Sequence, residues 1–419
     1  MKADLVILNI SKIISPTEAT GNETKHSSEL ITTTINAAIA IKDGIILAIG
    51  NESDIVSQYR PDEILDADRK VVLPGFVDSH SHPVFVATRE DEFAMRIAGK
   101  SYVEIAQSGG GIRSTIASTR DASEDLLFEL AARRIEKMIS LGTTTLEAKS
   151  GYGLDTNSEL KQLRVIKRLN DELPIDIVPT FMGAHEYPAE YKDDHAKYIN
   201  ILCQEMIPAV AEQGIAEYCD IFTEAHVFSI KESEQILSCA KGHGLKLKMH
   251  ADEIEPIGGA ELSAEIGCVS ADHLGAASDK GIAAMKDAGV IPVLLPATLF
   301  SLRSKHYARA RYMLDMGLPV AIATDYNPGS CNCDSMAFIM TLACLQMGMS
   351  PEEALLAATI NAAKAVSRHE SIGSLAPGKY ADLCLWDIPS LNFIPYHFGS
   401  SHLIRVIKKG KTIFSAKNS

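Results

Sequence analysis

The chain has 419 residues, of which 46% are hydrophobic and 22% are charged. This composition provides enough apolar side chains for a large core, and it excludes a disordered or fibrous protein. The net charge of −14 argues against nucleic acid as a partner.

The sequence lacks the features of a membrane or secreted protein. Its longest apolar candidate, residues 290–300, is interrupted by Pro292 and Pro296 and is shorter than the roughly 18 to 20 residues of a membrane helix. Asp4 precedes the first short apolar run, which is unlike a secretory signal. The eight cysteines are scattered without a C-x-x-C pair, so we expect reduced thiols. We therefore expect a cytoplasmic protein with no membrane partner.

Both ends of the chain carry β-strand patterns. Near the N-terminus, two apolar runs flank Asp43 and Gly44, and an Asp-Gly pair in this position indicates a β-hairpin. Near the C-terminus, residues 373–387 also have strand character. Because neither end has enough apolar residues for its own core, we expect residues 1-68 and 372-419 to form one small β-sandwich domain together.

The middle of the chain, residues 69-371, alternates short apolar runs with longer amphipathic segments. Residues 121–141 have the clearest helical period, with Leu127, Ala131 and Ile135 on one face. The alternation is typical of an α/β fold with a parallel sheet, and eight strands close a (β/α)8 barrel of the TIM type. The eight strand-like runs are 71–78, 143–148, 175–182, 218–223, 245–249, 269–273, 290–295 and 320–324.

Polar side chains follow several of these strands, where the active site of such a barrel lies. His80 and His82 follow the first strand, and because side chains two residues apart point the same way, both imidazoles should face the barrel mouth. His250 follows the fifth strand and Asp325 the eighth. These four groups are typical ligands of one zinc or iron ion with a position left for water. His273, after the sixth strand, would lie beside that water.

Several motifs resemble those of one enzyme superfamily. PGFVDSHSH, the later histidine and aspartate, and the closing GSLAPGKYADL resemble the amidohydrolase superfamily. The further motifs SYVEIAQSGGGIRSTIASTR, EAKSGYGL, TFMGAH, KMHADE, SADHL and ATDYNPGS resemble its branch that opens the ring of 4-imidazolone-5-propanoate in histidine degradation. The resemblance covers nearly the whole chain. It implies a metal-dependent hydrolase that forms N-formimidoyl-L-glutamate.

The resemblance also implies roles for single residues. It implies metal ligation by His80, His82, His250 and Asp325, and substrate contacts by Arg89, Tyr102, Tyr152, His185, Glu253, Asn327, Gly329 and Ser330. A small anionic heterocyclic substrate needs a cation, and the planar guanidinium of Arg89 would pair with its carboxylate. Barrels of this family often pair, so a homodimer is expected.

Two questions stay open at this point. Asp325 or Glu253 would take the proton of the attacking water and return one to the leaving nitrogen, while His273 would stabilise the developing negative charge. The alternative functions are another amidohydrolase reaction, such as deamination of a heterocycle, and a barrel that binds a small molecule without turnover. Glu224 and Lys149 are expected to form structural ion pairs rather than to bind metal.

Overall fold

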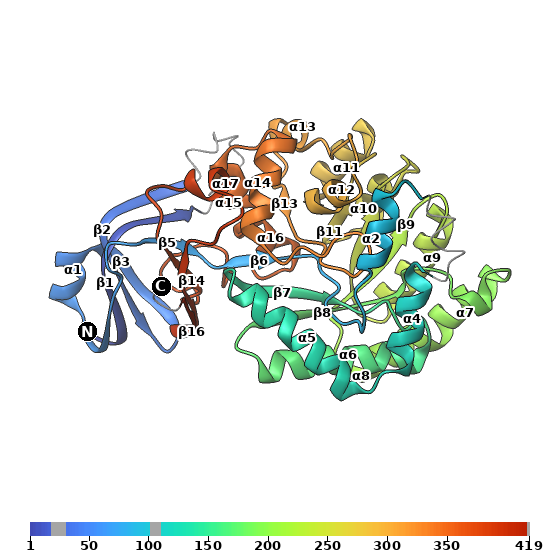
Figure 1. Ribbon diagram of the computed structural model, residues 1–419, viewed down its shortest axis with the longest axis horizontal. Coiled ribbons are helices and arrows are strands. Elements are labelled where there is room, and N and C mark those ends of the chain that lie inside the picture. The colour runs from blue at the N-terminus through green and yellow to red at the C-terminus, as the bar shows by residue number, and fades with distance from the viewer. Residues whose placement is uncertain (18–30, 101–109, 417–419) are drawn as a thin grey trace.

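The computed structural model describes residues 1–17, 31–100 and 110–416, whose strands form two sheets (Figure 1). The strands are β1 (Lys2–Pro16), β2 (Ile31–Lys42), β3 (Ile45–Asn51), β4 (Arg60–Asp66), β5 (Val71–Pro74), β6 (Phe76–Asp78), β7 (Thr143–Lys149), β8 (Asp176–Ala184), β9 (Tyr218–Thr223), β10 (Lys246–Ala251), β11 (Ser270–His273), β12 (Ile291–Leu294), β13 (Ala321–Ile322), β14 (Leu383–Trp386), β15 (Leu403–Lys408) and β16 (Lys411–Ser415). The helices are α1 (Glu52–Gln58), α2 (Glu90–Ile97), α4 (Ile112–Asp121), α5 (Glu124–Ile139), α6 (Thr156–Glu172), η2 (Ala189–Tyr191), α7 (His195–Ile201), η3 (Leu202–Met206), α8 (Ile207–Gln213), α9 (Ile230–Gly242), α10 (Gly259–Ile266), α11 (Asp279–Ala288), α12 (Pro296–Ser301), α13 (Ala310–Asp315), α14 (Met336–Met347), α15 (Pro351–Ala357), α16 (Ile360–Ala365) and α17 (Phe393–Tyr396). None of the helices in these ranges is long and apolar enough to cross a membrane.

The first sheet joins strands from both ends of the chain. Its order is β16-β15-β14-β5-β1-β2-β3, and β4 also pairs with β1. Ile7 of β1 and Ile39 of β2 share one buried cluster with Leu383 of β14 and Ile407 of β15. The N-terminal and C-terminal strands therefore enclose a common core, which confirms a small β domain built from both ends. The domain limits expected from the sequence stay a prediction.

The expected hairpin connects β2 and β3. Asp43 and Gly44 both have positive φ angles, 52° and 77°, which a two-residue turn matched to the strand twist requires. The chain after β15 passes close to this turn, because a Cβ on Gly44 would lie 3.0 Å from the carbonyl oxygen of Lys409. The N-terminal hairpin therefore lies against the turn between β15 and β16.

The second sheet is the parallel barrel, whose strands follow one another in the order β6 to β13. Ser81, after β6, pairs with Tyr326, after β13, and this bridge closes the ring. Each of the eight expected strand positions carries a strand in the part of the chain that the structure describes. The (β/α)8 barrel is therefore confirmed.

The expected first strand, residues 71–78, is wrong as a single element. β5 pairs with β1 and β14 in the terminal sheet, and only β6 pairs with β7 in the barrel. The chain crosses from one sheet to the other at Gly75, where a Cβ would lie 2.3 Å from the side chain of Thr144. A glycine is required there because the buried side chain of Thr144 leaves no room for a Cβ.

Helices surround the barrel, and α5 illustrates how they are fixed (Figure 1). Ser123 begins this helix because its hydroxyl accepts a hydrogen bond from the first turn at 3.2 Å. Leu127, Ala131 and Ile135 recur at helical spacing and are fully buried in the main hydrophobic cluster. Burial of each large side chain contributes about 1.5–3 kcal/mol. The helical period expected within residues 121–141 is confirmed.

Candidate active site

Hydrogen bonds tie the ends of β6 and β13 together beside the candidate ligands. Asp78, the last residue of β6, accepts hydrogen bonds from the backbone N–H of Thr324 at 3.0 Å and from its hydroxyl at 2.5 Å. Asp325, which follows Thr324 in the chain, donates its backbone N–H to the carbonyl oxygen of His80 at 3.0 Å. His80 and Asp325 are therefore neighbours across the seam where the barrel closes.

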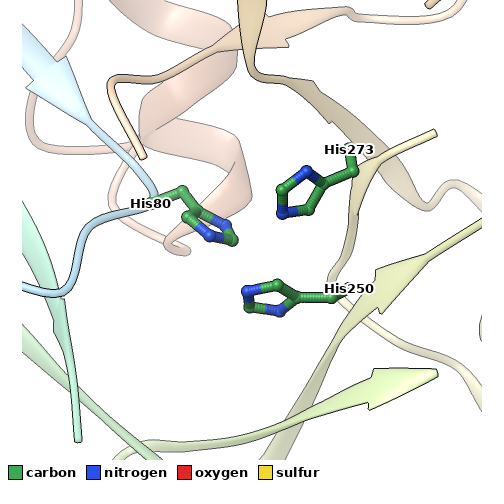
Figure 2. A group of neighbouring side chains, drawn as sticks. All are labelled: His80, His250 and His273. Carbon is green, nitrogen blue, oxygen red and sulfur yellow. The ribbon is translucent and has the colours of Figure 1, made fainter. Parts of the chain in front are cut away.

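The predicted metal ligands converge at this seam. Oδ1 of Asp325 lies 3.5 Å from Nε2 of His80 and 3.7 Å from Nε2 of His82. Measured between ring centroids, His250 lies 4.5 Å from His80, and His273 lies 5.0 Å from His250. Figure 2 shows the rings of His80, His250 and His273 pointing toward one another from different strand ends. The fold thus brings the four predicted ligands together and adds His273 to the same cluster.

The chemistry of this cluster suits a divalent cation. Burial and the nearby ammonium of Lys149 hold the pKa of His80 well below its ordinary 6.5, and burial does the same for the pKa of His82. Both rings are therefore neutral and offer lone pairs. Nε2 of His80 is buried without a hydrogen-bond partner among the described residues, which is unfavourable unless a ligand uses it. The ligand atoms of His80, His82 and Asp325 lie within 4.8 Å of one another, a spacing that one cation can bridge.

His273 and Asp325 share a strained backbone conformation. Their φ angles are 73° and 49°, in the left-handed region that residues with a Cβ rarely adopt. Such a conformation costs about 1–2 kcal/mol for a residue other than glycine. Strain of this kind concentrates at functional sites, so it supports a role beyond packing for both side chains.

Two carboxyl groups flank the imidazoles. Asp325 accepts a hydrogen bond from the hydroxyl of Thr298 at 2.6 Å, and burial raises the pKa of Asp325 to about 6. Glu253, on the loop after β10, places Oε2 3.5 Å from Nδ1 of His273. Burial and repulsion by Asp325 raise the pKa of Glu253 to about 8. At neutral pH Glu253 therefore holds a proton, whereas Asp325 is mostly ionised.

Arg89 is fixed by contacts on two sides. Its Nε donates to Oε2 of Glu92 at 3.1 Å, and the other oxygen of Glu92 accepts a hydrogen bond from the backbone N–H of Gly111 at 2.7 Å. Gly329, in the loop that follows Asp325, lies against the guanidinium, because a Cβ there would be 2.2 Å from Nη2 of Arg89. Arg89, which is predicted to bind the substrate carboxylate, therefore contacts the loop after Asp325 that is also predicted to contact substrate.

Two more predicted substrate residues lie beside His82. The ring of His185 stacks on His82 at 5.1 Å with 20° between the planes, and the ring of Tyr152 lies 5.9 Å from His82. Burial raises the pKa of Tyr152, so its phenol keeps a proton to donate. Tyr102, also predicted to contact substrate, lies outside the described residues.

The side chain of Asn327 orders the loop after Asp325. Its Oδ1 accepts hydrogen bonds from the backbone N–H groups of Gly329 and Ser330, both at 2.8 Å. Its Nδ2 donates to the carbonyl oxygen of Asp325 at 2.7 Å. Asn327 therefore shapes the segment that carries Gly329 and Ser330, and direct contacts of all three with substrate stay predictions.

Lys149 and Glu224 form contacts next to the imidazole cluster. Lys149 forms the expected structural ion pairs, with Nζ 2.9 Å from Glu147 and 2.6 Å from Asp220. Glu224 instead accepts a hydrogen bond from the backbone N–H of Ile254 at 2.9 Å, and so holds the loop that also carries Glu253.

Sequence reasoning missed that a whole network of charges lies inside the barrel. The network consists of Glu147, Lys149, Asp220, Lys248 and Asp272, all fully buried. A signal for it was present, because each of these charged residues stands within or at the end of an apolar strand, where an unpaired charge would be strongly unfavourable.

Comparison with known sequences places this site in a family. Residues 71–413 match the model of the Amidohydrolase family. The chain is 45% identical over 415 residues to the imidazolonepropionase of Alkaliphilus metalliredigens, which covers 99% of this chain and 98% of that protein. It is 48% identical over 417 residues to the imidazolonepropionase of Clostridium tetani, with 99% of each chain covered.

Solved structures share the fold at much lower identity. Guanine deaminase of E. coli superimposes with a TM-score of 0.75 at 15% identity, covering 98% of this chain and 100% of that one. An adenosine deaminase from Xanthomonas campestris with bound zinc gives a TM-score of 0.73 at 16% identity, covering 98% of this chain and 93% of that one. At these identities the likeness concerns the fold alone.

Proposed function

The chain belongs to the amidohydrolase family and, within it, to the imidazolonepropionases, and we propose that it opens the ring of 4-imidazolone-5-propanoate with water to give N-formimidoyl-L-glutamate. This reaction is a step in the degradation of L-histidine to glutamate. The observation that carries the proposal is the guanidinium of Arg89, held by Glu92 against Gly329 in the loop that follows Asp325. A substrate whose propionate binds this cation can present its ring to the imidazole cluster.

We assign one divalent cation, zinc or iron, to His80, His82, His250 and Asp325. Three imidazoles and a carboxylate suit either metal, and the similar deaminase from Xanthomonas campestris was crystallised with bound zinc. When bound, such a cation would lower the pKa of a water molecule toward about 7 and would polarise the ring carbonyl.

The side chains of the site orient the substrate. Because Nε of Arg89 is engaged by Glu92, its two Nη groups are left to pair with the propionate. Tyr152 and His185, whose rings lie beside His82, contact the imidazolone ring from that side. The carbonyl carbon is thereby held next to the attacking water.

Two carboxyl groups transfer the protons of the reaction. Water forms the new C–O bond at the ring carbonyl, and the bond from that carbon to the ring nitrogen breaks. Asp325, mostly ionised at neutral pH, takes a proton from the water, and protonated Glu253 donates one to the departing nitrogen. Neutral His273, whose Nδ1 faces Glu253, donates Nε2–H to the negative charge that develops on the carbonyl oxygen.

Elemental analysis and a substrate comparison test this function. The purified protein should contain one zinc or iron ion per chain and hydrolyse freshly made imidazolone propionate. The carboxamide analogue should react with a kcat/KM about 100-fold lower, because it offers Arg89 no negative charge. Equal rates on both compounds would favour another amidohydrolase reaction. Tight binding of the acid without metal or turnover would favour a binding protein.

We further propose a homodimer that acts in the cytoplasm without nucleic acid or membrane partners. The net charge of −14 supports the exclusion of nucleic acid. The eight cysteines are free thiols in the structure, which suits a reducing compartment. Light scattering should give twice the chain mass of 45.3 kDa, and a particle of 45.3 kDa would contradict the dimer.

A further inference from the structure

Inside the barrel, charged side chains with no exposed surface form a connected network. Nζ of Lys149 lies 2.9 Å from Oε1 of Glu147 and 2.6 Å from Oδ2 of Asp220. Nζ of Lys248 lies 3.0 Å from the same oxygen of Glu147 and 4.0 Å from Oδ2 of Asp272. Enclosed charges are unfavourable unless they are paired, and the two ammonium groups pair all three carboxylates.

Two of these carboxylates contact imidazoles of the candidate metal site. Oδ2 of Asp272 lies 2.6 Å from Nδ1 of His80, and Oδ2 of Asp220 lies 3.2 Å from Nδ1 of His250. A neutral imidazole carries one N–H, and a carboxylate can only accept. The proton of His80 therefore belongs on Nδ1, which is hydrogen-bonded to Asp272, and the lone pair of this ring is left on Nε2.

The free nitrogen of His80 faces Asp325, another of the ligands assigned to the cation. Its Nε2 lies 3.5 Å from Oδ1 of Asp325 and has no hydrogen-bond partner among the described residues. Histidines that bind metal usually donate their other N–H to a carboxylate, which fixes the ring and raises its basicity.

We propose that Asp272 is a positioning residue that fixes His80 in the tautomer that binds the cation. Lys149 links this carboxylate to the rest of the network, because its Nζ lies 3.8 Å from Asp272 and 2.6 Å from Asp220. Oδ1 of Asp272 is fixed separately by the hydroxyl of Ser270 at 2.7 Å. The proposal rests on the metal site of the proposed function, although not on the identity of the substrate.

The test compares two isosteric neutral variants of the full chain. Asp272→Asn removes the charge that faces His80. Glu147→Gln removes a charge from the same network, but Glu147 hydrogen-bonds to Lys149 and Thr180 and to no histidine of the described chain. Metal-free protein is titrated with Zn²⁺ in competition with a chromogenic chelator, and the unfolding midpoint of the metal-free protein is measured by circular dichroism.

Asp272→Asn should raise the dissociation constant for Zn²⁺ by about 10- to 100-fold. Glu147→Gln should lower the unfolding midpoint, because it removes a negative charge that pairs with the buried lysines. It should leave Zn²⁺ affinity within about 3-fold, because Glu147 hydrogen-bonds to none of these imidazoles. Unchanged Zn²⁺ affinity in Asp272→Asn, or an equal loss in both variants, would overturn the proposal.

A measurement on the unaltered protein tests the proposal even if a variant does not fold. The imidazole ¹⁵N shifts of His80 in the metal-free protein should report the Nδ1–H tautomer, and the Nε2–H tautomer would overturn the proposal. Neither readout uses substrate. Failure to hydrolyse imidazolone propionate would therefore reject the proposed function alone, whereas normal hydrolysis with the wrong tautomer would reject only this inference.

Discussion

The guanidinium of Arg89 packs directly on the backbone of Gly329. The φ angle of Gly329 lies outside the left-handed region, so space rather than backbone conformation demands glycine there. Arg96, on helix α2, which begins directly after Arg89, donates from Nη1 to the carbonyl oxygen of Gly329 at 3.1 Å. The loop after Asp325 and the helix after Arg89 are therefore held against each other, and the position of the Arg89 guanidinium, which we propose binds the propionate, depends on both.

Gly329→Ala should raise KM for imidazolone propionate about tenfold while kcat changes less. The added Cβ would lie 2.2 Å from Nη2 of Arg89 and displace the guanidinium, whereas the imidazole cluster keeps its geometry. Steady-state kinetics measure the split. Gly242→Ala is the matched control, because a Cβ at Gly242 meets no atom within 4 Å. An unchanged KM in Gly329→Ala would show that Arg89 does not bind the propionate in this position.

Arg89→Lys should raise KM for the acid by about 10- to 100-fold. Lysine keeps the positive charge but loses the planar pair of donors and the contact through Nε to Glu92. The carboxamide analogue lacks the negative charge, so its kcat/KM should stay within about threefold. Equal losses for the acid and the carboxamide would indicate a general disturbance of the site instead.

Strand positions could be predicted where the apolar pattern is strong, but the sheet that a strand joins could not. The run 218–223 is a strand with the same limits in the structure. The run 71–78 is continuous in pattern yet divides at Gly75, because the division depends on contact with Thr144. Thr144 lies far along the chain, and no local pattern reveals such a contact.

The same limit applies to the site. His80 and Asp325 could be found because ligand residue types at strand ends are visible in a sequence. Asp272 also stands at a strand end, but its contact with His80 joins residues 192 positions apart. Its charge inside an apolar strand could signal a buried partner without revealing which one.

Removal of the cation should abolish activity and lower the unfolding temperature. A ligand that binds only the folded state stabilises it by about 2.7 kcal/mol at 100 times its dissociation constant. Protein dialysed against a chelator should therefore melt earlier in differential scanning fluorimetry, and Zn²⁺ or Fe²⁺ should restore both properties. Full activity in protein shown by elemental analysis to be metal-free would reject the metal-dependent mechanism.

Glu253→Gln should lower kcat by about 10²- to 10⁴-fold and leave KM within a few-fold. Glutamine keeps the size and hydrogen-bonding atoms of the side chain but cannot transfer a proton to the leaving nitrogen. Glu255→Gln on the same loop is the control, since Glu255 is exposed and should tolerate the change. A raised KM with kcat preserved would instead assign Glu253 to anchoring the ring.

Asp176→Asn should weaken the junction between the barrel and the terminal sheet in a pH-dependent way. Asp176 of β8 lies 2.8 Å from the ammonium groups of both Lys408 and Lys409. Burial works to raise the pKa of Asp176, but the two lysines outweigh it and hold that pKa below its ordinary 3.8. A lowered pKa means that the ionised carboxylate stabilises the fold at pH values above 3.8, and that this contribution is lost as the pH falls through the lower value of the folded state.

The variant should therefore lose about 1 kcal/mol of unfolding free energy at pH 7, a modest value because the pair is partly exposed and screened by water. Urea unfolding of metal-free protein, compared with the unaltered chain from pH 7 to pH 3, should show the difference shrinking below pH 3.8. Asp171→Asn removes an exposed pair with Lys167 and should change stability by less than about 0.5 kcal/mol throughout. A deficit in Asp176→Asn that persists undiminished at pH 3 would point to lost packing rather than lost charge.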